Sequence, residues 1–269
     1  MPKILRAEPE ALSENEAREA DPLFVRTVGR AMQVLGAFHQ ANGPLSLSEI
    51  AEGAGIDRSA AQRLVHTLLS LGYLRRGTDG RGYLPGVRVL DTTLDLLRLD
   101  PMVQKATPVL LELRKTVRER VDLSLYDGSR LVYALRMQSK RETFYATLVG
   151  HSVPLYCTAG GRAVLSALHE NDAKRILTRS PLQPYTSRTQ TDPEVIMDRI
   201  EQARQDGYAV VVNEFLQGEV AIGIAIKRNG IPLGALHVAG SLSEWTPEAF
   251  VDHIAPLATE AAHAVIGSL

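Results

Sequence analysis

The sequence predicts an α+β protein with an N-terminal winged helix-turn-helix, a linker helix and a C-terminal domain built on a mostly antiparallel sheet. Three observations lead to this fold class. Residues 46–71 contain two short helical patterns separated by a tight turn, and a glycine-rich tip with three arginines follows them. Beyond Pro101, hairpin signals such as Asp127-Gly128 and Asn229-Gly230 alternate with helical patterns. The 269 residues are enough for two domains, each with its own core.

Composition and pattern divide the chain into four segments. We expect a flexible acidic tail at 1–23, the winged helix-turn-helix at 24–86, the linker helix at 87–100 and the larger C-terminal domain at 101–269. The basic charge is concentrated near the N-terminal domain, since residues 24–90 hold eight arginines and four acids, a net charge of +4 (8 − 4). The whole chain has a net charge of −1, so a phosphate-binding surface is expected in that stretch alone.

The first predicted helix spans residues 25–40. Val28, Met32, Leu35 and Phe38 recur there at helical spacing. Arg26 and Arg30 lie on one side of this helix, where both are candidates for contacts with a DNA backbone.

The helix-turn-helix is predicted from its capping residues. Ser46 and Glu49 stand three positions apart, as a capping box requires at the start of a helix. Gly55 permits the sharp turn, Asp57 can cap the second helix, and Gly72 ends it.

The second of these helices has two distinct faces. Ala61, Leu64, Val65 and Leu68 follow helical spacing and are predicted to face the core. The opposite face combines donors, acceptors and a cation suited to base edges and phosphates, and comprises Ser59, Gln62, Arg63, His66 and Ser70. Arg58, at the start of the helix, is a further candidate for contact with DNA. An ordinary surface helix pair would also show a polar face, so the pattern of this helix alone leaves that alternative open.

The residues that follow favour the DNA-binding interpretation. Residues 74–84 are predicted to form two short strands around a glycine-rich tip, which is a β-wing. Arg75, Arg76 and Arg81 can reach phosphates or the minor groove from it.

The linker helix, predicted at 87–99, carries an apolar stripe of Leu90, Leu94 and Leu97. Such a stripe needs a partner surface. A second copy of the helix is the simplest partner, which predicts a homodimer, and packing on its own domain is the alternative. A two-fold dimer would bind a near-palindromic operator in double-stranded DNA.

The C-terminal domain is predicted to alternate helices and strands. Helices are expected at 103–118, 159–168, 193–207 and 247–266, and strands at 121–126, 130–137, 143–149, 208–212, 221–227 and 232–239. Pro193 suits a first helical position, and Thr246 can cap the last helix.

Composition excludes several classes of protein. The single cysteine, Cys157, rules out an internal disulfide and a cysteine-rich zinc site. An apolar run near eighteen residues is lacking, so we expect no membrane span. The acidic N-terminal tail has no apolar stretch typical of a signal peptide, and a cytoplasmic protein is predicted.

From about Phe24 onward the chain resembles the IclR family of bacterial transcriptional regulators. The resemblance is carried by Val28-Gly29-Arg30-Ala31-Met32-Gln33-Val34-Leu35, by the helix-turn-helix through Gly72-Tyr73-Leu74, by Pro154-Leu155-Tyr156-Cys157-Thr158-Ala159-Gly160-Gly161-Arg162-Ala163, and by the stretch from Gly207-Tyr208 through Glu214, Gly218 and Ile222 to Gly240. It implies a repressor or activator whose C-terminal domain, similar to GAF domains, binds a small effector. It also implies dimers that often pair into tetramers.

Two residues depart from the pattern of the family. Ala60 stands where a threonine is usual, which leaves the operator sequence open, and Arg162 replaces a usual lysine while keeping its charge.

The resemblance also implies an effector pocket between the sheet and the loop at 154–162. The residues that align with its lining or its glycine-bearing turn are Tyr145, Cys157, Thr158, Ala159, Gly160, Gly161, Asn213, Ala221, His237 and Ala239. Backbone amides at 159–161 begin a helix and favour a carboxylate, and their glycines would let a ligand approach closely. Small side chains at Ala221 and Ala239, beside the Tyr145 ring, predict that the effector is a small carboxylate, preferably an aromatic one. The regulator is then expected to control a catabolic operon.

Three alternative functions are an enzyme, a metal-binding sensor and an architectural DNA-binding protein. Cys157 with His151 or His237 resembles a nucleophile and base, but a third orienting residue is not evident, so no catalytic residue is predicted. The same three residues could approach one another in a metal-binding sensor, although their spacing matches no metal motif, and neither metal nor cofactor is predicted. A third alternative is an architectural DNA-binding protein whose C-terminal domain only dimerises.

Overall fold

The computed structural model describes residues 21–138 and 149–269. The chain divides into two compact units, with the boundary between Arg98 and Leu99. Each unit is built around its own buried core.

The N-terminal unit contains helices and a two-stranded wing. Its elements are α2 (Arg26–Gly36), a 3₁₀ turn (Ala37–Gln40), α3 (Leu47–Gly53), α4 (Arg58–Ser70), β1 (Leu74–Arg76), β2 (Tyr83–Pro85) and most of α5 (Arg88–Leu99). The strands β1 and β2 pair antiparallel, so the winged helix-turn-helix predicted from the sequence is confirmed.

The predicted caps form in this unit. The Ser46 backbone N–H donates to the Glu49 carboxylate at 2.7 Å, and the Glu49 N–H donates to the Ser46 hydroxyl at 3.3 Å, which completes the capping box. The Asp57 carboxylate accepts from the Ala60 N–H at 2.8 Å at the start of α4. Gly72 follows α4 with a φ of +78°, a conformation that favours glycine.

The apolar residues of α2 are distributed differently from what their spacing alone suggests. Val34 is fully buried in the core, and Leu35 and Phe38 pack against it while partly exposed. Val28 and Met32 are more than half exposed. Among residues 21–98, these two side chains of α2 therefore form a second apolar stripe that is largely left open to solvent.

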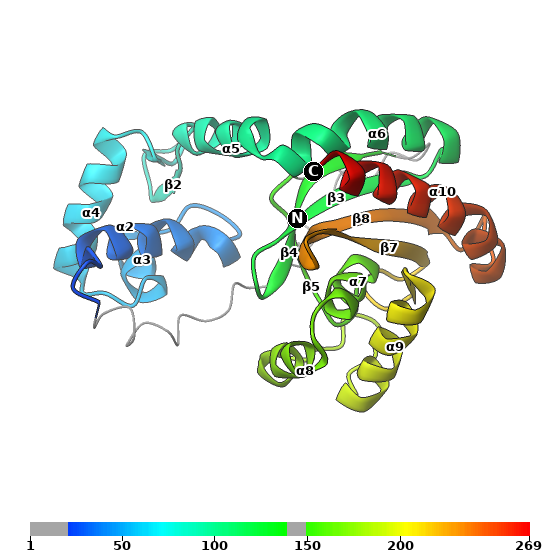
Figure 1. The fold of residues 1–269 in the computed structure, drawn as a ribbon. Helices are drawn as coiled ribbons and strands as arrows, with labels where there is room; N and C mark the ends of the chain where they lie inside the picture. The colour runs from blue at the N-terminus through cyan, green and yellow to red at the C-terminus, as the bar shows by residue number, and fades with distance from the viewer. Residues whose placement is uncertain (1–20, 139–148) are drawn as a thin grey trace. The chain divides into compact units, whose positions relative to one another are not determined.

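In the described residues, the C-terminal unit is built on a six-stranded antiparallel sheet with the order β5-β4-β3-β8-β7-β6. Its elements are α6 (Pro101–Val117), β3 (Arg120–Tyr126), β4 (Arg130–Met137), β5 (Ser152–Pro154), α7 (Ala159–Ala167), α8 (Glu170–Arg179), α9 (Pro193–Asp206), β6 (Ala209–Val212), β7 (Glu219–Arg228), β8 (Ile231–Ser241) and α10 (Pro247–Ser268). Helices α6 and α10 cover one face of the sheet, and α7 with α8 and α9 lies on the other (Figure 1). The predicted α+β class is confirmed.

Most predicted elements of this unit are present. The sequence interpretation missed two of them, the helix α8 and the short edge strand β5. The strand predicted at 143–149 falls almost wholly outside the described residues.

The start of α7 lies directly on the sheet. A Cβ added to Gly223 of β7 would lie 2.3 Å from the Gly160 nitrogen, and one added to Gly160 would lie 1.9 Å from the His237 ring. Both glycines are therefore needed for the close approach between α7 and the sheet, which positions the site described below.

Candidate functional site

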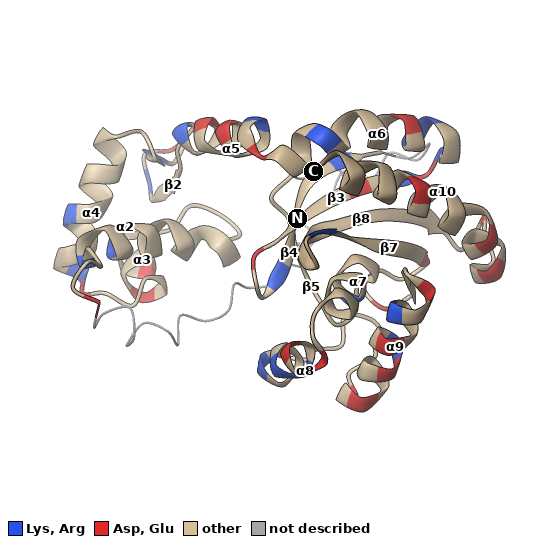
Figure 2. Ribbon diagram, viewed as in Figure 1, with Lys and Arg blue, Asp and Glu red and all other residues tan. Residues whose placement is uncertain are grey.

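The polar face of α4 is presented to solvent. Arg58, Ser59, Gln62, Arg63, His66 and Ser70 are all exposed, and the basic residues of this helix are blue in Figure 2. On the opposite side, Ala61, Val65 and Leu68 are buried and Leu64 is partly buried. The helix thus offers a polar surface to solvent and an apolar surface to the core, as a helix that enters a major groove requires.

The arginines of α2 also belong to this surface. Arg26 and Arg30 are both exposed. The hydrogen bond from the Ala60 N–H lowers the pKa of Asp57, and the charges of Arg63 and Arg30 lower it further. Arg30 of α2 and Arg63 of α4 therefore lie near the same carboxylate at the start of α4.

The wing is held by its glycines. The Gly77 N–H donates to the Gly82 carbonyl at 3.2 Å, and a Cβ at Gly77 would lie 2.2 Å from the Arg81 carbonyl oxygen. Arg75, Arg76 and Arg81 are all exposed, and the Arg76 guanidinium lies 4.5 Å from the centre of the Tyr83 ring. This cation–π contact restrains Arg76, whereas its charge stays accessible to solvent.

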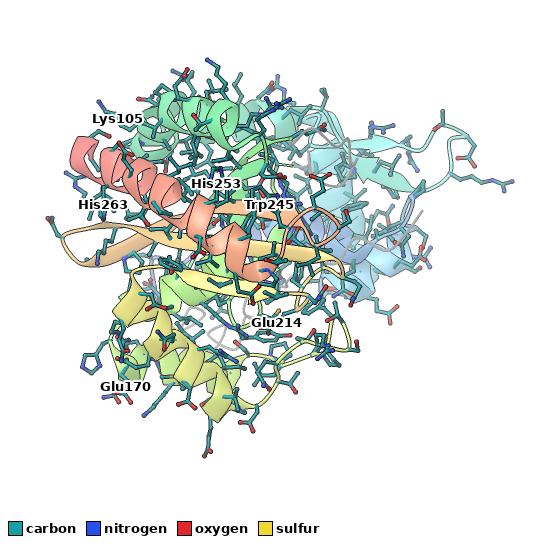
Figure 3. The ribbon with its side chains drawn as sticks, turned by 90° about the vertical axis from the view of Figure 1, so that its right-hand side faces the viewer. Lys105, Glu170, Glu214, Trp245, His253 and His263 are labelled. Carbon is teal, nitrogen blue, oxygen red and sulfur yellow. The ribbon has the colours of Figure 1, made fainter. Side chains whose placement is uncertain are left out.

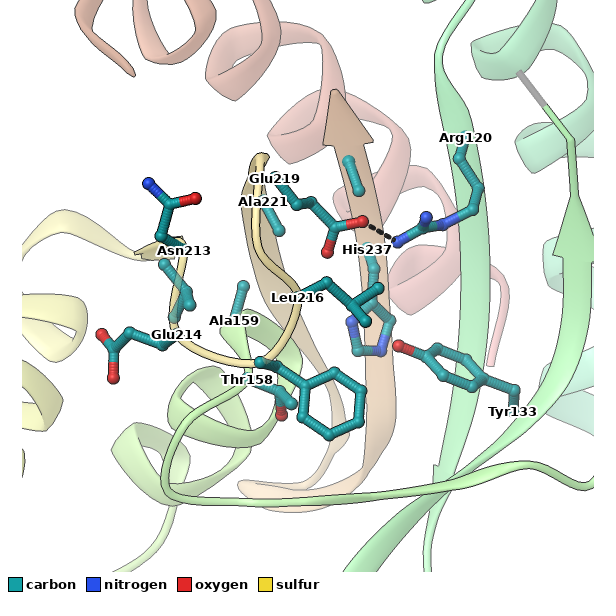
Figure 4. A pocket seen from close by; sticks show the side chains of 13 residues that line it. Arg120, Tyr133, Thr158, Ala159, Asn213, Glu214, Leu216, Glu219, Ala221 and His237 are labelled. Atoms are coloured by element: carbon teal, nitrogen blue, oxygen red, sulfur yellow. Dashed lines mark hydrogen bonds and ion pairs between the residues drawn. The ribbon is translucent and has the colours of Figure 1, made fainter. Parts of the chain in front are cut away.

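A cavity lies in the C-terminal unit between the α7 side of the sheet, the start of α7 and the loop that joins β6 to β7 (Figure 4). Its volume is about 20 Å³, which is room for about one water molecule. Six predicted residues line it: Thr158, Ala159, Asn213, Ala221, His237 and Ala239. Seven further lining residues were not predicted: Arg120, Tyr133, Val211, Glu214, Phe215, Leu216 and Glu219.

The other predicted residues occupy different places. Cys157, Gly160 and Gly161 are buried beside the cavity and are not among the described residues that line it. Tyr145 lies outside the described residues.

Four charged side chains form a chain of ion pairs at this site. Arg120 contacts Glu219 of β7 at 2.6 Å and Asp122 of its own strand at 3.0 Å. Arg136 of β4 contacts the other oxygen of Asp122 at 3.2 Å. Two cations and two carboxylates balance, so these four side chains carry no net charge.

Neutral polar groups lie next to this chain. The Ser124 hydroxyl and the His237 Nε2 are 2.7 Å apart, and the centres of the Tyr133 and His237 rings are 5.3 Å apart. Burial is the main cause that lowers the pKa of His237 to about 4; the charge of Asp122 opposes this shift, and the charges of Arg136 and Arg120 add to it. His237 is therefore neutral at pH 7, and burial raises the pKa of Tyr133, which stays protonated.

The glycine-bearing turn that the sequence suggested as an anion site is closely surrounded by protein atoms. The Gly161 N–H donates to the Thr158 hydroxyl at 3.3 Å, and the Arg162 N–H donates to the Thr158 carbonyl at 2.9 Å. His237 and Gly223 lie against Gly160. The glycines thus allow a close approach of the sheet.

Arg162 is likewise engaged within the protein. Its guanidinium forms two hydrogen bonds to the Glu214 carboxylate, at 2.7 and 2.6 Å, and a third to the Tyr156 carbonyl at 2.8 Å. Glu214 lies on the α7 and α9 side of the sheet, opposite Trp245 and His253 (Figure 3). The pair ties the β6–β7 loop to α7.

The β6–β7 loop is fixed at its base. Asn213 adopts a φ of +60°, and its side-chain oxygen accepts from the Gly218 N–H at 2.6 Å. The Thr186 and Thr189 hydroxyls donate to the carbonyls of Asn213 and Glu214, at 2.5 and 2.6 Å. The tip between these anchors carries Phe215, which is buried, and Leu216, which is 40% exposed.

The residues that the sequence analysis missed had a recognisable signal. Arg120, Asp122 and Ser124 alternate with Val121 and Leu123 along β3, so one face of a buried strand is polar. Polar side chains at successive inward positions of a strand indicate a site, because burial of polar groups without partners is costly.

Nucleophilic and metal chemistry find little support here. Cys157 is fully buried, and burial raises the pKa of its thiol, which disfavours the reactive thiolate. Within residues 21–138 and 149–269, no three His, Cys, Asp or Glu side chains are grouped so as to hold a metal ion. Within the same residues, no helix is both long and apolar enough to cross a membrane.

Comparisons with known proteins give matches to both units of the chain. The model of the IclR helix-turn-helix domain matches residues 27–77, and the model of the bacterial transcriptional regulator IclR C-terminal domain matches residues 95–266. The Pca regulon regulatory protein of Pseudomonas putida is 30% identical over 244 residues, which cover 90% of this chain and 83% of that protein.

Solved structures show the same fold. The IclR structure of Thermotoga maritima is 28% identical, with a TM-score of 0.68, and the match covers 91% of this chain and 98% of that chain. An IclR homologue from Microbacterium hydrocarbonoxydans, complexed with 4-hydroxybenzoate, is 22% identical, with a TM-score of 0.73, and covers 90% and 98% of the two chains.

Proposed function

Because this chain belongs to the IclR family of bacterial transcriptional regulators, we propose that it controls a catabolic operon in response to a small carboxylate, preferably an aromatic one. The observation that carries the proposal is the cavity lined by Arg120, Tyr133 and His237. An enzymatic role is not proposed, since the relatives compared above are transcriptional regulators.

The DNA-binding part of the proposal assigns α4 as the recognition helix. Its exposed polar residues can contact base edges, whereas Arg26 and Arg30 of α2 and the wing arginines contact phosphates or the minor groove. The exposed arginines and the buried apolar face of α4 support this assignment.

We propose that the active form is at least a dimer. No residue of α5 is buried in the described chain, and Leu90 and Leu94 are each more than 60% exposed. Pairing of this helix with a second copy would remove these leucines from water, at about 25 cal/mol per Å² of apolar surface. Two recognition helices related by two-fold symmetry would then read a near-palindromic operator.

The effector part of the proposal rests on the chemistry of the cavity. Arg120 supplies a cation in a partly buried site, where a charged hydrogen bond to a carboxylate is strong. Tyr133 supplies a hydroxyl group, and the neutral ring of His237 lies beside it (Figure 4). Such a lining suits an acid with a polar ring better than a neutral apolar ligand.

The cavity has to widen before it can hold such an acid. Its volume of about 20 Å³ is far below the several hundred Å³ that ligand pockets usually provide. The tip of the β6–β7 loop is the part that can move, because Leu216 is exposed while both ends of the loop are hydrogen-bonded. An aromatic effector is also supported by the complex of the Microbacterium homologue with 4-hydroxybenzoate.

A ligand screen tests this function. Thermal unfolding should be followed with benzoate, 4-hydroxybenzoate, glyoxylate, pyruvate and the neutral 4-hydroxybenzamide, each at several concentrations. We expect an aromatic acid to raise the unfolding temperature, because a ligand at 100 times its Kd stabilises a protein by about 2.7 kcal/mol. The same acid should change the affinity for a duplex selected from a random library. Stabilisation by the amide alone would refute the carboxylate, and a preference for pyruvate would refute the aromatic ring.

A further inference from the structure

We propose that Glu219 is a built-in counter-ion of Arg120 that a carboxylate effector displaces on binding. The inference rests on the function proposed above, since it concerns the same cavity and the same class of ligand. It goes further by naming the residue that holds the acid and the residue that competes with it.

The ion pair occupies the position that a bound acid would take. Arg120 of β3 and Ala221 of β7 are both paired with Ala239 of β8, which lies between them in the sheet. The Arg120 side chain reaches across the strand β8 to Glu219 at the start of β7 (Figure 4). The small side chain of Ala239 leaves room for this crossing, and all four residues line the cavity.

The balance of charge requires an anion next to Arg120. Without Glu219, two arginines would face the single carboxylate of Asp122, which already contacts both of them. An uncompensated charge in a buried site is strongly destabilising. Either Glu219 or an external carboxylate therefore has to be present, and one can replace the other with no change in net charge.

Glu219 is the member of the group that is best placed to leave. Its side chain is 19% exposed, compared with 1% for Asp122 and 5% for Arg136. The backbone around it stays anchored, because the Asn213 N–H donates to the Glu219 carbonyl at 2.9 Å and the Leu242 N–H to the Gly218 carbonyl at 2.9 Å. A side-chain rotation can thus move the carboxylate to water without unfolding the edge of the sheet.

Displacement of the Glu219 carboxylate would expose side chains that can contact the ring and the far end of an aromatic acid. Leu216 extends from the loop towards the rings of His237 and Tyr133, and all three side chains line the cavity (Figure 4). In the described part of the chain, the Tyr133 hydroxyl has no hydrogen-bond partner, so it is available to a polar group of a ligand. An acid bound to Arg120 would therefore place its ring against the loop and its far end towards Tyr133.

The exchange can be tested with a variant that removes only the competing charge. Glu219→Gln keeps the shape of the side chain but weakens its hold on Arg120. Calorimetric titration with 4-hydroxybenzoate should show binding about tenfold tighter than in the wild type. The neutral 4-hydroxybenzamide should bind both proteins equally within a factor of two. Glu194→Gln, at an exposed position of α9, removes the same charge far from the cavity and should leave both affinities unchanged.

A second variant tests the role of the cation. The double variant Arg120→Gln/Glu219→Gln removes one charge of each sign, so that Asp122 remains paired with Arg136. Its fold is checked by thermal unfolding, and its affinity for 4-hydroxybenzoate should fall at least tenfold below that of Glu219→Gln. Equal affinity of the acid for wild type and Glu219→Gln would overturn the exchange while leaving the carboxylate effector in place. If benzoate, 4-hydroxybenzoate, glyoxylate and pyruvate all failed to bind both the wild type and Glu219→Gln, the carboxylate effector and the exchange would both be refuted.

Discussion

Replacement of Gly160 by alanine should destabilise the C-terminal unit, although alanine is normally the better helix former. A Cβ at this position would lie 1.9 Å from the His237 Cε1 and 2.5 Å from its Nε2. His237 is buried, and its ring cannot move away without lengthening the 2.7 Å contact to the Ser124 hydroxyl. Overpacking costs about 1–3 kcal/mol and a lost hydrogen bond about 1 kcal/mol, which gives roughly 2–4 kcal/mol in total.

The measurement is urea unfolding of the full chain, with a probe that reports on the C-terminal unit. The Trp245 fluorescence serves for this, since Trp245 is the only tryptophan and it packs against Phe250 and His253. Gly267→Ala is the matched control. It makes the same change in helix α10, where an added Cβ meets nothing within 4 Å, so its effect should be neutral or stabilising by less than about 1 kcal/mol.

The cause of the destabilisation can be separated from a general helix effect. His237→Ala removes the ring that the new methyl group would meet, so Gly160→Ala should cost much less in that background. The coupling between the two substitutions is expected to exceed about 1 kcal/mol. If Gly160→Ala were as stable as Gly267→Ala, the close packing of α7 on β8 would be refuted.

Three further predictions follow from the two units. Arg63→Ala should weaken binding to a selected operator by about 1–3 kcal/mol in a fluorescence polarisation assay, while the control Glu170→Ala should leave it unchanged. Equal affinities of the wild type and Arg63→Ala would show that α4 does not form the DNA interface. Light scattering should show that the wild-type protein is at least a dimer at micromolar concentration, and the double variant Leu90→Glu/Leu94→Glu should be a monomer. A wild-type protein that is monomeric both with and without DNA would contradict the pairing of α5. Because burial lowers the pKa of His237 to about 4 from 6.5, the unfolded chain takes up its proton first on acidification, and stability should fall between pH 6.5 and 4 by up to about 3 kcal/mol. His237→Asn should flatten this part of the pH profile, and an unchanged slope would show that His237 is not the titrating group.

The elements that could be predicted are those whose signals are local. The capping box of Ser46 and Glu49, the Asp57 cap and the Asn229-Gly230 turn each depend on residues within four positions of one another. Both residues of that turn have positive φ, as the hairpin signal requires. The strand β5 has only three residues and is defined by its pairing with β4, which is not a local property.

The pocket was predicted less completely because it is assembled from residues far apart in the sequence. Arg120 and Glu219 are 99 positions apart, and the register of three strands brings them together. A register shift between Leu123 and Ser124 adds a second difficulty. Strict alternation along β4 would place Tyr133 on the same face as Leu135, and the irregularity instead turns Tyr133 and Arg136 to one face. No pattern in β4 alone reveals this.

The glycines of α7 show why a motif indicates geometry before it indicates chemistry. A glycine at a helix start reports that some group comes close to the backbone, and the sequence cannot say whether that group is a ligand or the protein itself. At Gly160 the neighbouring group is the ring of His237, and at Gly223 it is the backbone of α7. Protein groups therefore occupy the space next to Gly160, and the cation among the residues that line the cavity is Arg120, whose present partner, Glu219, is itself a carboxylate.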